Sequence, residues 1–490
     1  MGLGNIVKSI RNIMRNDAGI SGDAQRIEQM VWILFLKVYD EKEKVWEFNE
    51  TGFRSIIPDR LRWRAWAVDR HDGMAPTGEK LLMLVNEDLF PTLKSLPVDA
   101  TTEPRKALVR AVFEDGNNYM KDGVLLRQVV NVIDEIDFSK YEDRHAIGEI
   151  YETILKELQA AGSAGEFYTP RALTDFIVGR VAPKLGETLA DLTCGTGGFL
   201  TSSLKALEPQ VKTVADRETV NRSLYGIEKK PLPYLLCVTN MLLHGIDAPG
   251  ILHGNSLERD VREYKENEKF HVIVMNPPYG GGEKEGVKTN FPTDLRSGET
   301  ADLFMTVIMY RLKKNGRAAV ILPDGFLFGT EGAKAAIKAK LLSECNLHTV
   351  VRLPHSVFAP YTSITTNILF FDKTGPTKET WFYRLDMPEG YKHFSKTKPM
   401  LLEHFDPVVE WWNDRRPIQV DGADKARLYT IDEIKAGRYN LDLCGFPHEE
   451  EEILPPLELI AQYQTRRAEF NARIDAVLAD ITAILGGSAQ

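Results

Sequence analysis

Apolar residues in the first 145 positions recur every three or four residues, which is the spacing of one face of an α-helix. One series runs along residues 27–38 and another along residues 129–133, and few alternating β-branched stretches interrupt them. The residues of these two series are Ile27, Met30, Val31, Leu34, Val38, Val129, Val130, Val132 and Ile133. The pattern predicts an α-helical N-terminal domain over residues 1–145.

From residue 146 to residue 375 the pattern changes to short apolar stretches, each followed by amphipathic helical sequence. The stretches predict strands at residues 189–192, 223–228, 270–275, 318–322, 349–353 and 366–371. Alternation of strand and helix predicts an α/β domain with a mostly parallel sheet and helices on both faces. Ligands of such sheets bind at the carboxyl ends of strands, near the point where strand order reverses.

The C-terminal part divides into two further segments. Residues 376–448 show no regular period, and we expect an irregular extension packed on the sheet. Residues 449–490 begin with four glutamates and then predict one long helix with a narrow apolar stripe. The stripe consists of Ile460, Tyr463, Phe470, Ile474, Val477, Ile481 and Ile484. It indicates either docking on the chain's own core or a seam for a partner helix.

Composition narrows the class of protein. The 490 residues are 43% hydrophobic and 27% charged, as in globular proteins, and the formal net charge is −9. That charge argues against a protein that coats nucleic acid by bulk electrostatics. The four cysteines form no Cys-x-x-Cys pair for metal or redox chemistry, and we expect free thiols in a reducing cytoplasm. The apolar run at residues 31–36 is too short to cross a bilayer, so we expect no membrane association.

A glycine-rich turn follows the strand predicted at residues 189–192. Asp191 precedes Gly195, Thr196 and Gly197, where a backbone without Cβ atoms lets a ligand approach closely. The next strand ends at Glu228, whose carboxylate is placed to accept both ribose hydroxyls of an adenosine-containing cofactor. The alternative for the glycine-rich turn is that it only packs a helix on the sheet, and the alternative for Glu228 is a solvated acid at the end of a strand.

The tetrad Asn276-Pro277-Pro278-Tyr279 directly follows the strand predicted at residues 270–275. The prolines fix the backbone, so the Asn276 side-chain oxygen and the Pro277 carbonyl can both accept from one planar NH2 group. Tyr279 offers a ring for stacking. Two acceptors stabilise the positive charge that grows on a conjugated nitrogen as it attacks a methyl group. The alternative is a stiff structural turn.

Taken together, these residues resemble amino-methyltransferases that use S-adenosylmethionine, and most closely the modification (M) subunits of type I restriction-modification systems. The resemblance implies a Rossmann-like methyltransferase core with Asn276, Pro277, Pro278 and Tyr279 as its catalytic residues. It implies cofactor contacts from Glu166, Phe167, Tyr168, Thr169, Pro170, Arg171, Asp191, Gly195, Thr196, Gly197, Glu228, Asn255 and Ser256. Residues 240–246, 322–325, 366–369 and 438–443 also look like family segments. Two residues depart from the family pattern: Leu192 stands where the family usually has Pro, and Asn255 stands where it frequently has Asp.

The resemblance also implies a substrate and partners. The substrate is the exocyclic amine of adenine in duplex DNA, flipped out of the stack to reach the cleft. Partners are a specificity (S) subunit that chooses the site, a second M subunit and, in the full complex, a restriction (R) subunit. The C-terminal stripe is expected to contact the specificity subunit. No segment of the chain looks like a DNA-reading module of its own.

Two basic-aromatic segments are candidate DNA contacts. Residues 280–300 carry Lys284, Lys288, Phe291 and Arg296 after three glycines, and we hypothesise that they order on DNA, the alternative being an idle surface loop. The cluster from Arg60 to Trp66 is better explained by tryptophans packed inward beside solvated arginines.

Three other functions are compatible with these motifs. A glutamine-amide protein methyltransferase acts on an equally planar NH2 group, although such chains are typically shorter. A catalytically silent subunit that binds S-adenosylmethionine would only assemble the complex. An NAD-dependent oxidoreductase is disfavoured because Leu200 occupies the third glycine position of the dinucleotide fingerprint.

Overall fold

A computed structural model of the protein describes residues 3–69, 74–99, 101–136, 168–359, 362, 364–395, 398–445 and 456–486. Residues 1–445 form one compact unit and residues 446–490 a second. Within the described ranges, no helix combines the length and the apolar character that a membrane span requires.

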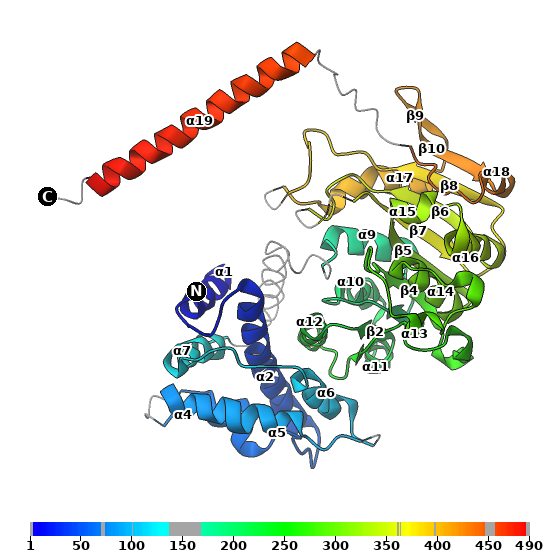
Figure 1. Ribbon diagram of the computed structural model, residues 1–490. Helices are drawn as coiled ribbons and strands as arrows, with labels where there is room; N and C mark the ends of the chain where they lie inside the picture. The colour runs from blue at the N-terminus through cyan, green and yellow to red at the C-terminus, as the bar shows by residue number, and fades with distance from the viewer. Residues whose placement is uncertain are drawn as a thin grey trace. The chain divides into compact units, whose positions relative to one another are not determined.

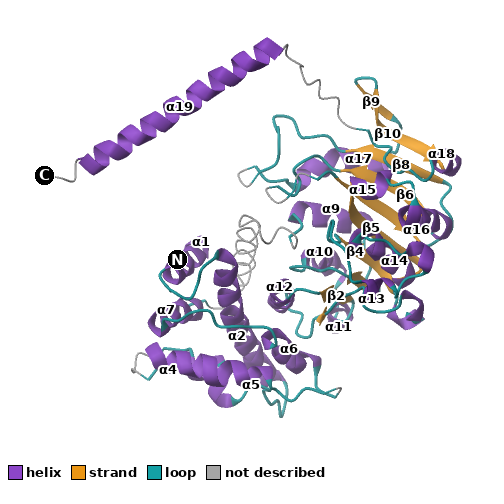
Figure 2. Cartoon of the chain, viewed as in Figure 1, coloured by secondary structure: helices purple, strands orange, loops and turns teal. Residues whose placement is uncertain are grey.

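The described N-terminal residues contain helices and loops but no strand, which agrees with the helical region expected there (Figure 2). The helices are α1 (Leu3–Arg15), α2 (Asp23–Asn49), α3 (Trp63–Trp66), α4 (Gly78–Met83), α5 (Phe90–Lys94), α6 (Pro104–Phe113) and α7 (Gly123–Asp134). Asp122 caps α7 because its carboxylate accepts from the backbone N–H groups of Val124 and Leu125. The predicted domain boundary at residue 145 lies outside the described residues.

The described strands form one ten-stranded sheet in the order β3-β2-β1-β4-β5-β7-β6-β8-β10-β9. Its strands are β1 (Leu189–Asp191), β2 (Leu224–Glu228), β3 (Gly250–His253), β4 (Phe270–Met275), β5 (Leu312–Pro323), β6 (Asn346–Arg352), β7 (Thr366–Asp372), β8 (Glu379–Arg384), β9 (Ile418–Val420) and β10 (Ala423–Thr430). The strands from β3 to β5 pair in parallel, and β7 inserts antiparallel between β5 and β6. The α/β fold class with a mostly parallel central sheet is therefore confirmed.

Helices cover both faces of the sheet because its central strands are apolar on both sides. In β4, Val272 and Val274 belong to one hydrophobic cluster, whereas Ile273 and Met275 belong to the other. Figure 1 shows α9, α10 and α12 on one side and α14 and α16 on the other. The helices of this region are α9 (Arg171–Val181), α10 (Gly198–Leu207), α11 (Val214–Asn221), α12 (Pro231–Leu243), α13 (Glu285–Lys288), α14 (Thr300–Arg311), α15 (Asp324–Phe328), α16 (Gly332–Glu344), α17 (Asp406–Asn413) and α18 (Ile431–Ala436).

The sequence pattern missed four strands. The extension at residues 376–448, expected to be irregular, instead continues the sheet through β8, β10 and β9. β9 and β10 are joined at Asp421 and Gly422, which both have positive φ, as a tight hairpin requires. Short strands near a sheet edge lack a continuous apolar run, so periodicity alone does not reveal them. β3 at the opposite edge is equally short, and its Leu252 is 51% exposed.

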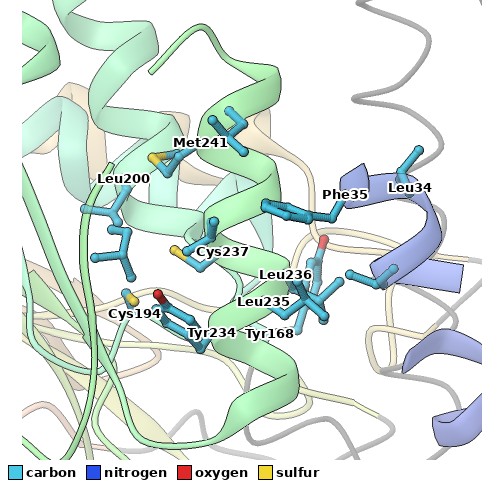
Figure 3. Close-up of a cluster of buried hydrophobic side chains, with 14 of the residues drawn as sticks. Leu34, Phe35, Tyr168, Cys194, Leu200, Tyr234, Leu235, Leu236, Cys237 and Met241 are labelled. Carbon is cyan, nitrogen blue, oxygen red and sulfur yellow. The ribbon is translucent and has the colours of Figure 1, made fainter. Parts of the chain in front are cut away.

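The N-terminal helices and the sheet region share one hydrophobic core. Helix α2 packs along α12, and Figure 3 shows Phe35 of α2 pointing toward α12 beside Leu235 and Leu236. At the end of α12, Asp247 accepts from Lys42 Nζ at 2.8 Å and from Trp46 Nε1 at 3.0 Å. Helix α12 therefore contacts the helical region on one side and the sheet on the other.

The second unit contains α19 (Pro456–Gly486), the long helix predicted at the C-terminus. The described side chains of its apolar stripe are exposed, with Phe470 at 63% and Ile474 at 55%.

Candidate active site

The strand order reverses between β1 and β4, which are parallel neighbours with β2 beyond β1 and β5 beyond β4. The glycine-rich turn after β1 and the tetrad after β4 therefore meet at the carboxyl edge of the sheet. A cavity of about 410 Å³ opens there, which is within the range of small-molecule sites. Its lining includes Thr193, Glu228, Asn255, Ser256, Asn276, Pro278 and Glu283.

The glycine-rich turn has the backbone that its sequence predicts. Gly195 and Gly197 have φ values of 52° and 83°, a region in which a side chain would be strained. The Gly195 N–H donates to Glu228 Oε2 at 2.9 Å, so the turn and the predicted ribose acid hold each other. The buried Asn240 of α12 donates from Nδ2 to the Thr196 carbonyl at 3.0 Å and fixes the far side of the turn.

Two carboxyl groups beneath this turn are strongly perturbed. The pKa of Asp191 is raised to about 8, chiefly by burial. The hydrogen bond from the Thr193 N–H lowers this pKa, and the nearby charge of Glu228 raises it. Burial also raises the pKa of Glu228, although the N–H groups of Lys230 and Gly195 lower it. Carboxyl groups perturbed in this way inside a cleft are typical of binding and catalytic sites.

The segment before α9 lies against the glycine-rich turn. A Cβ atom on Gly198 would stand 2.5 Å from Arg171 Nη1, so a side chain at position 198 would displace the guanidinium from the turn. The Arg171 guanidinium lies 5.8 Å from the ring of the buried Tyr168. Of the predicted contacts in this segment, the structure places Tyr168, Thr169, Pro170 and Arg171, whereas Glu166 and Phe167 lie outside the described residues.

Asn276 is held at three points. Its side-chain Nδ2 donates to Thr169 Oγ1 at 3.1 Å, and its Oδ1 accepts from the Tyr279 hydroxyl. Its backbone carbonyl accepts from Thr193 Oγ1 at 3.3 Å. Pro277 is buried, and Pro278 lines the cavity. The amide of Asn276 therefore has a defined orientation, with nitrogen toward Thr169 and oxygen toward Tyr279.

The cofactor contacts expected at Asn255 and Ser256 follow β3 and border the same cavity. Ser256 donates from Oγ to the Leu192 carbonyl at 2.6 Å, which links it to the glycine-rich turn. Asn255 Oδ1 accepts from the Leu257 N–H at 3.1 Å, so its Nδ2 points elsewhere, to Glu283 Oε1 at 3.4 Å. The structure thus brings Asn255 and Ser256 to one cavity with Glu228 and Asn276.

Sequence reasoning missed three residues of this site. Thr193 and Asn240 lie inside motifs that it quoted, but their hydrogen bonds join segments far apart in the chain. Glu283 follows the three glycines and was overlooked, because nothing in its local sequence points to Asn255, 28 residues before it.

The aromatic residues of both candidate DNA contacts are buried. Phe291 is fully buried, and Arg296 Nε donates to its carbonyl at 3.0 Å, so Phe291 is a core residue and not a DNA contact. In the N-terminal cluster, Trp63 and Trp66 are buried as expected. Its arginines pair with acidic residues, including Arg64 with Asp40 at 2.8 Å.

The remaining family-like segments meet at Arg352 of β6, away from the cavity lining. This buried arginine donates from Nη2 to Asp324 at 2.9 Å and to Asp442 at 2.5 Å, and from Nε to Asn367 at 3.2 Å. Its Nη1 donates to the Gly445 carbonyl at 2.8 Å. These three segments thus build a polar network inside the fold.

Comparison with known proteins agrees with this architecture. Residues 142–452 match the family model described as N-6 DNA Methylase, and residues 3–133 match the HsdM N-terminal domain. The methylase subunit of the type I restriction enzyme EcoEI from Escherichia coli is 50% identical over 474 residues, 96% of this chain and 95% of that protein. This chain belongs to the family of type I restriction enzyme methylase subunits.

Solved structures of family members have the same fold over almost the whole chain. A modification subunit of a type I restriction enzyme from Vibrio vulnificus YJ016 superposes with a TM-score of 0.79 at 41% identity, covering 92% of this chain and 98% of that one. A chain from a structural study of type I R-M system assembly also superposes with a TM-score of 0.79. It is 34% identical, and the match covers 100% of this chain and 99% of that one. The family predicted from the sequence is therefore confirmed.

Proposed function

We propose that this chain transfers a methyl group from S-adenosylmethionine to the exocyclic amine of adenine in duplex DNA, at sites chosen by a specificity subunit. One observation supports this most directly. Asn276, the residue expected to act on the amine, lines the same cavity as Glu228, Asn255 and Ser256, the residues expected to hold the cofactor nucleoside. Donor and acceptor sites thus share one chamber, as a direct transfer requires.

The residues present fit the cofactor. Glu228 would accept the ribose hydroxyls, and Asn255 and Ser256 border the space for the adenine ring. Asp191, Thr169 and Thr193 line a recess of about 20 Å³ beside Asn276, which has room for little more than a water molecule and would have to widen to hold the methionine end. The cofactor supplies an electrophilic methyl group on a sulfonium sulfur.

The chain's own residues would then activate the amine. Asn276 Oδ1 and the Pro277 carbonyl would accept its two hydrogens, which stabilises the charge that develops as nitrogen attacks the methyl carbon. The nitrogen would take the methyl group from the sulfonium sulfur, leaving S-adenosylhomocysteine, and would then release one proton to water. The Tyr279 hydroxyl donates to Oδ1 in this structure, and this amide oxygen has a second lone pair that can accept from the amine. The Tyr279 ring offers a face on which the base would stack.

The proposed assembly comprises two copies of this chain, one specificity subunit and, in the full complex, a restriction subunit. The exposed apolar stripe of α19 supports a helical partner for the second unit. The specificity subunit is the partner that we assign to it.

The test replaces Asn276 with alanine in the complex of this chain with its specificity subunit. We expect methyl transfer from labelled cofactor to DNA to vanish while the dissociation constant of S-adenosylhomocysteine stays within about threefold, because Asn276 acts on the amine. Transfer that survives in the variant contradicts the assignment. Labelling of a protein acceptor instead of DNA favours the glutamine-amide alternative, and absence of any transfer by the parent complex favours the silent subunit.

A further inference from the structure

The loop after the Asn-Pro-Pro-Tyr tetrad folds back over the edge of the cavity. Gly280 and Gly281 have φ values of 71° and 75°, a left-handed backbone that reverses the chain. Thr300 Oγ1 donates to the carbonyls of Pro278 at 3.2 Å and Gly280 at 3.0 Å and fixes the start of this turn. The loop therefore brings Glu283 to the cavity lining.

Glu283 is a largely buried acid with one engaged oxygen. Its side chain is 11% exposed, and Oε1 accepts from Lys229 Nζ at 2.9 Å and from Asn255 Nδ2 at 3.4 Å. Among the residues that the structure describes, no other donor reaches this carboxylate, so Oε2 can accept from a ligand. An acid shielded from water in this way favours a ligand that brings its own N–H donors.

The neighbours of Glu283 identify which end of the cavity it serves. Lys229 directly follows Glu228 at the end of β2, and Asn255 follows β3. Both strands lie on the far side of β1 from β4 and Asn276. Glu283 therefore belongs to the nucleoside end of the proposed cofactor site and not to the end where the methyl group is transferred.

Asn255 is neutral and carries no negative charge at the nucleoside end of the cavity. Its side-chain nitrogen faces Glu283, which is an acceptor. Because Asn255 Oδ1 is occupied by the Leu257 N–H, its Nδ2 presents a hydrogen to Glu283. An aspartate at position 255 would set two carboxylates against each other at this distance and repel. The pair thus carries a single negative charge, located on residue 283.

We propose that Glu283 binds the exocyclic amine of the cofactor's adenine ring and distinguishes this purine from one with a 6-carbonyl group. The inference rests on the proposed cofactor site. A planar NH2 group donates to Oε2, whereas a carbonyl oxygen at the same position would face the carboxylate and be repelled. Lys229 and Asn255 hold Glu283 in place for this contact.

The experiment measures binding to the full-length chain by calorimetry, with S-adenosylhomocysteine and its inosine counterpart, S-inosylhomocysteine, as probes. We expect the parent to bind the adenosine compound at least about tenfold more tightly, as for one hydrogen bond to a charged group. Glu283→Ala should weaken that binding about tenfold and abolish the preference. The matched control is Glu285→Gln in the same loop, because the Glu285 side chain is 88% exposed and pairs with Lys288, and this variant should match the parent.

A charge exchange provides the second measurement. Asn255→Asp should weaken binding of S-adenosylhomocysteine, and adding Glu283→Gln should recover part of that loss, because the two carboxylates no longer repel and the glutamine still offers an amide oxygen to the amine. The inference is overturned if Glu283→Ala keeps both the affinity and the preference for the adenosine compound. It is also overturned if the affinity loss of the double variant equals the product of the losses measured for Asn255→Asp and Glu283→Gln alone. If the parent binds neither probe, the proposed cofactor site itself is wrong. Equal melting temperatures of the variants show that they are folded.

Discussion

The side-chain nitrogen of Asn276 donates a hydrogen bond to the hydroxyl oxygen of Thr169 at 3.1 Å, across 107 positions of sequence. Because an amide has nitrogen and oxygen on opposite sides, this bond decides where the oxygen points. Thr169, assigned to cofactor binding by resemblance, therefore also has a positioning role for Asn276 in this structure. A rotated amide would offer a donor to the incoming amine and oppose it.

Replacing Thr169 with valine separates these two roles. We expect kcat for DNA methylation to fall about 10- to 100-fold, because the valine offers no acceptor to hold the Asn276 amide. The dissociation constant for S-adenosylhomocysteine should change less than about threefold. Thr169→Ser keeps the hydroxyl and should restore most of kcat. A loss of cofactor affinity with unchanged kcat would instead make Thr169 a cofactor ligand only.

The raised pKa of Asp191 predicts a pH-dependent stability of the protein without cofactor. Between the ordinary pKa near 4 and the folded value of about 8, the folded state binds a proton that the unfolded state has lost. The contribution of Asp191 to the free energy of unfolding therefore falls as pH rises through this window and is constant outside it. Asp191→Asn keeps an acceptor for the Thr193 N–H and lacks the charge.

We accordingly expect the melting temperature of Asp191→Asn to exceed that of the parent at pH 8, and the difference to shrink toward pH 5. Thermal unfolding followed by circular dichroism across this range measures it. A difference that is constant over this range would mean that the pKa of Asp191 is not raised in the folded protein.

Arg352 provides a test of the polar network that joins the C-terminal segments to the sheet. Replacing it with leucine leaves Asp324 and Asp442 without their shared cation, and we expect a loss of about 3 kcal/mol in the free energy of unfolding. The control is Arg427→Leu, an exposed arginine that pairs with Asp424 at 3.2 Å and should cost less than about 1 kcal/mol. Urea unfolding measures the free energy of unfolding of both variants. Equal losses would mean that the network around Arg352 stabilises the protein no more than a surface ion pair does.

The apolar stripe of α19 predicts where the specificity subunit binds. We expect Phe470→Ser combined with Ile474→Ser to abolish co-purification with that subunit, as should truncation after residue 452. Arg473→Ala on the same helix is the control and should retain the complex. The melting temperature of the isolated double variant, measured beside that of the parent, shows that the chain still folds. Full complex yield from the double variant would show that the stripe is not the contact.

The sequence revealed the parts of this fold that depend on local chemistry. Strand β4 was predicted at the residues where it lies, because six mostly apolar residues in a row fit a strand buried on both faces. The glycine-rich turn was predicted because Gly195 and Gly197 have a backbone that other residues adopt only under strain. By contrast, β9 and β10 at a sheet edge were missed, since their polar residues carry no period.

The sequence by itself therefore determined the α/β class, the family and the two motifs that border the cavity, because each depends on residue types at short spacing. The tertiary structure alone decided which atoms meet. Thr169 with Asn276 and Asn255 with Glu283 are hydrogen-bonded pairs whose members lie 107 and 28 positions apart. Such contacts arise only when the strand order brings the ends of β1, β2, β3 and β4 to one edge of the sheet, and no local pattern encodes that order.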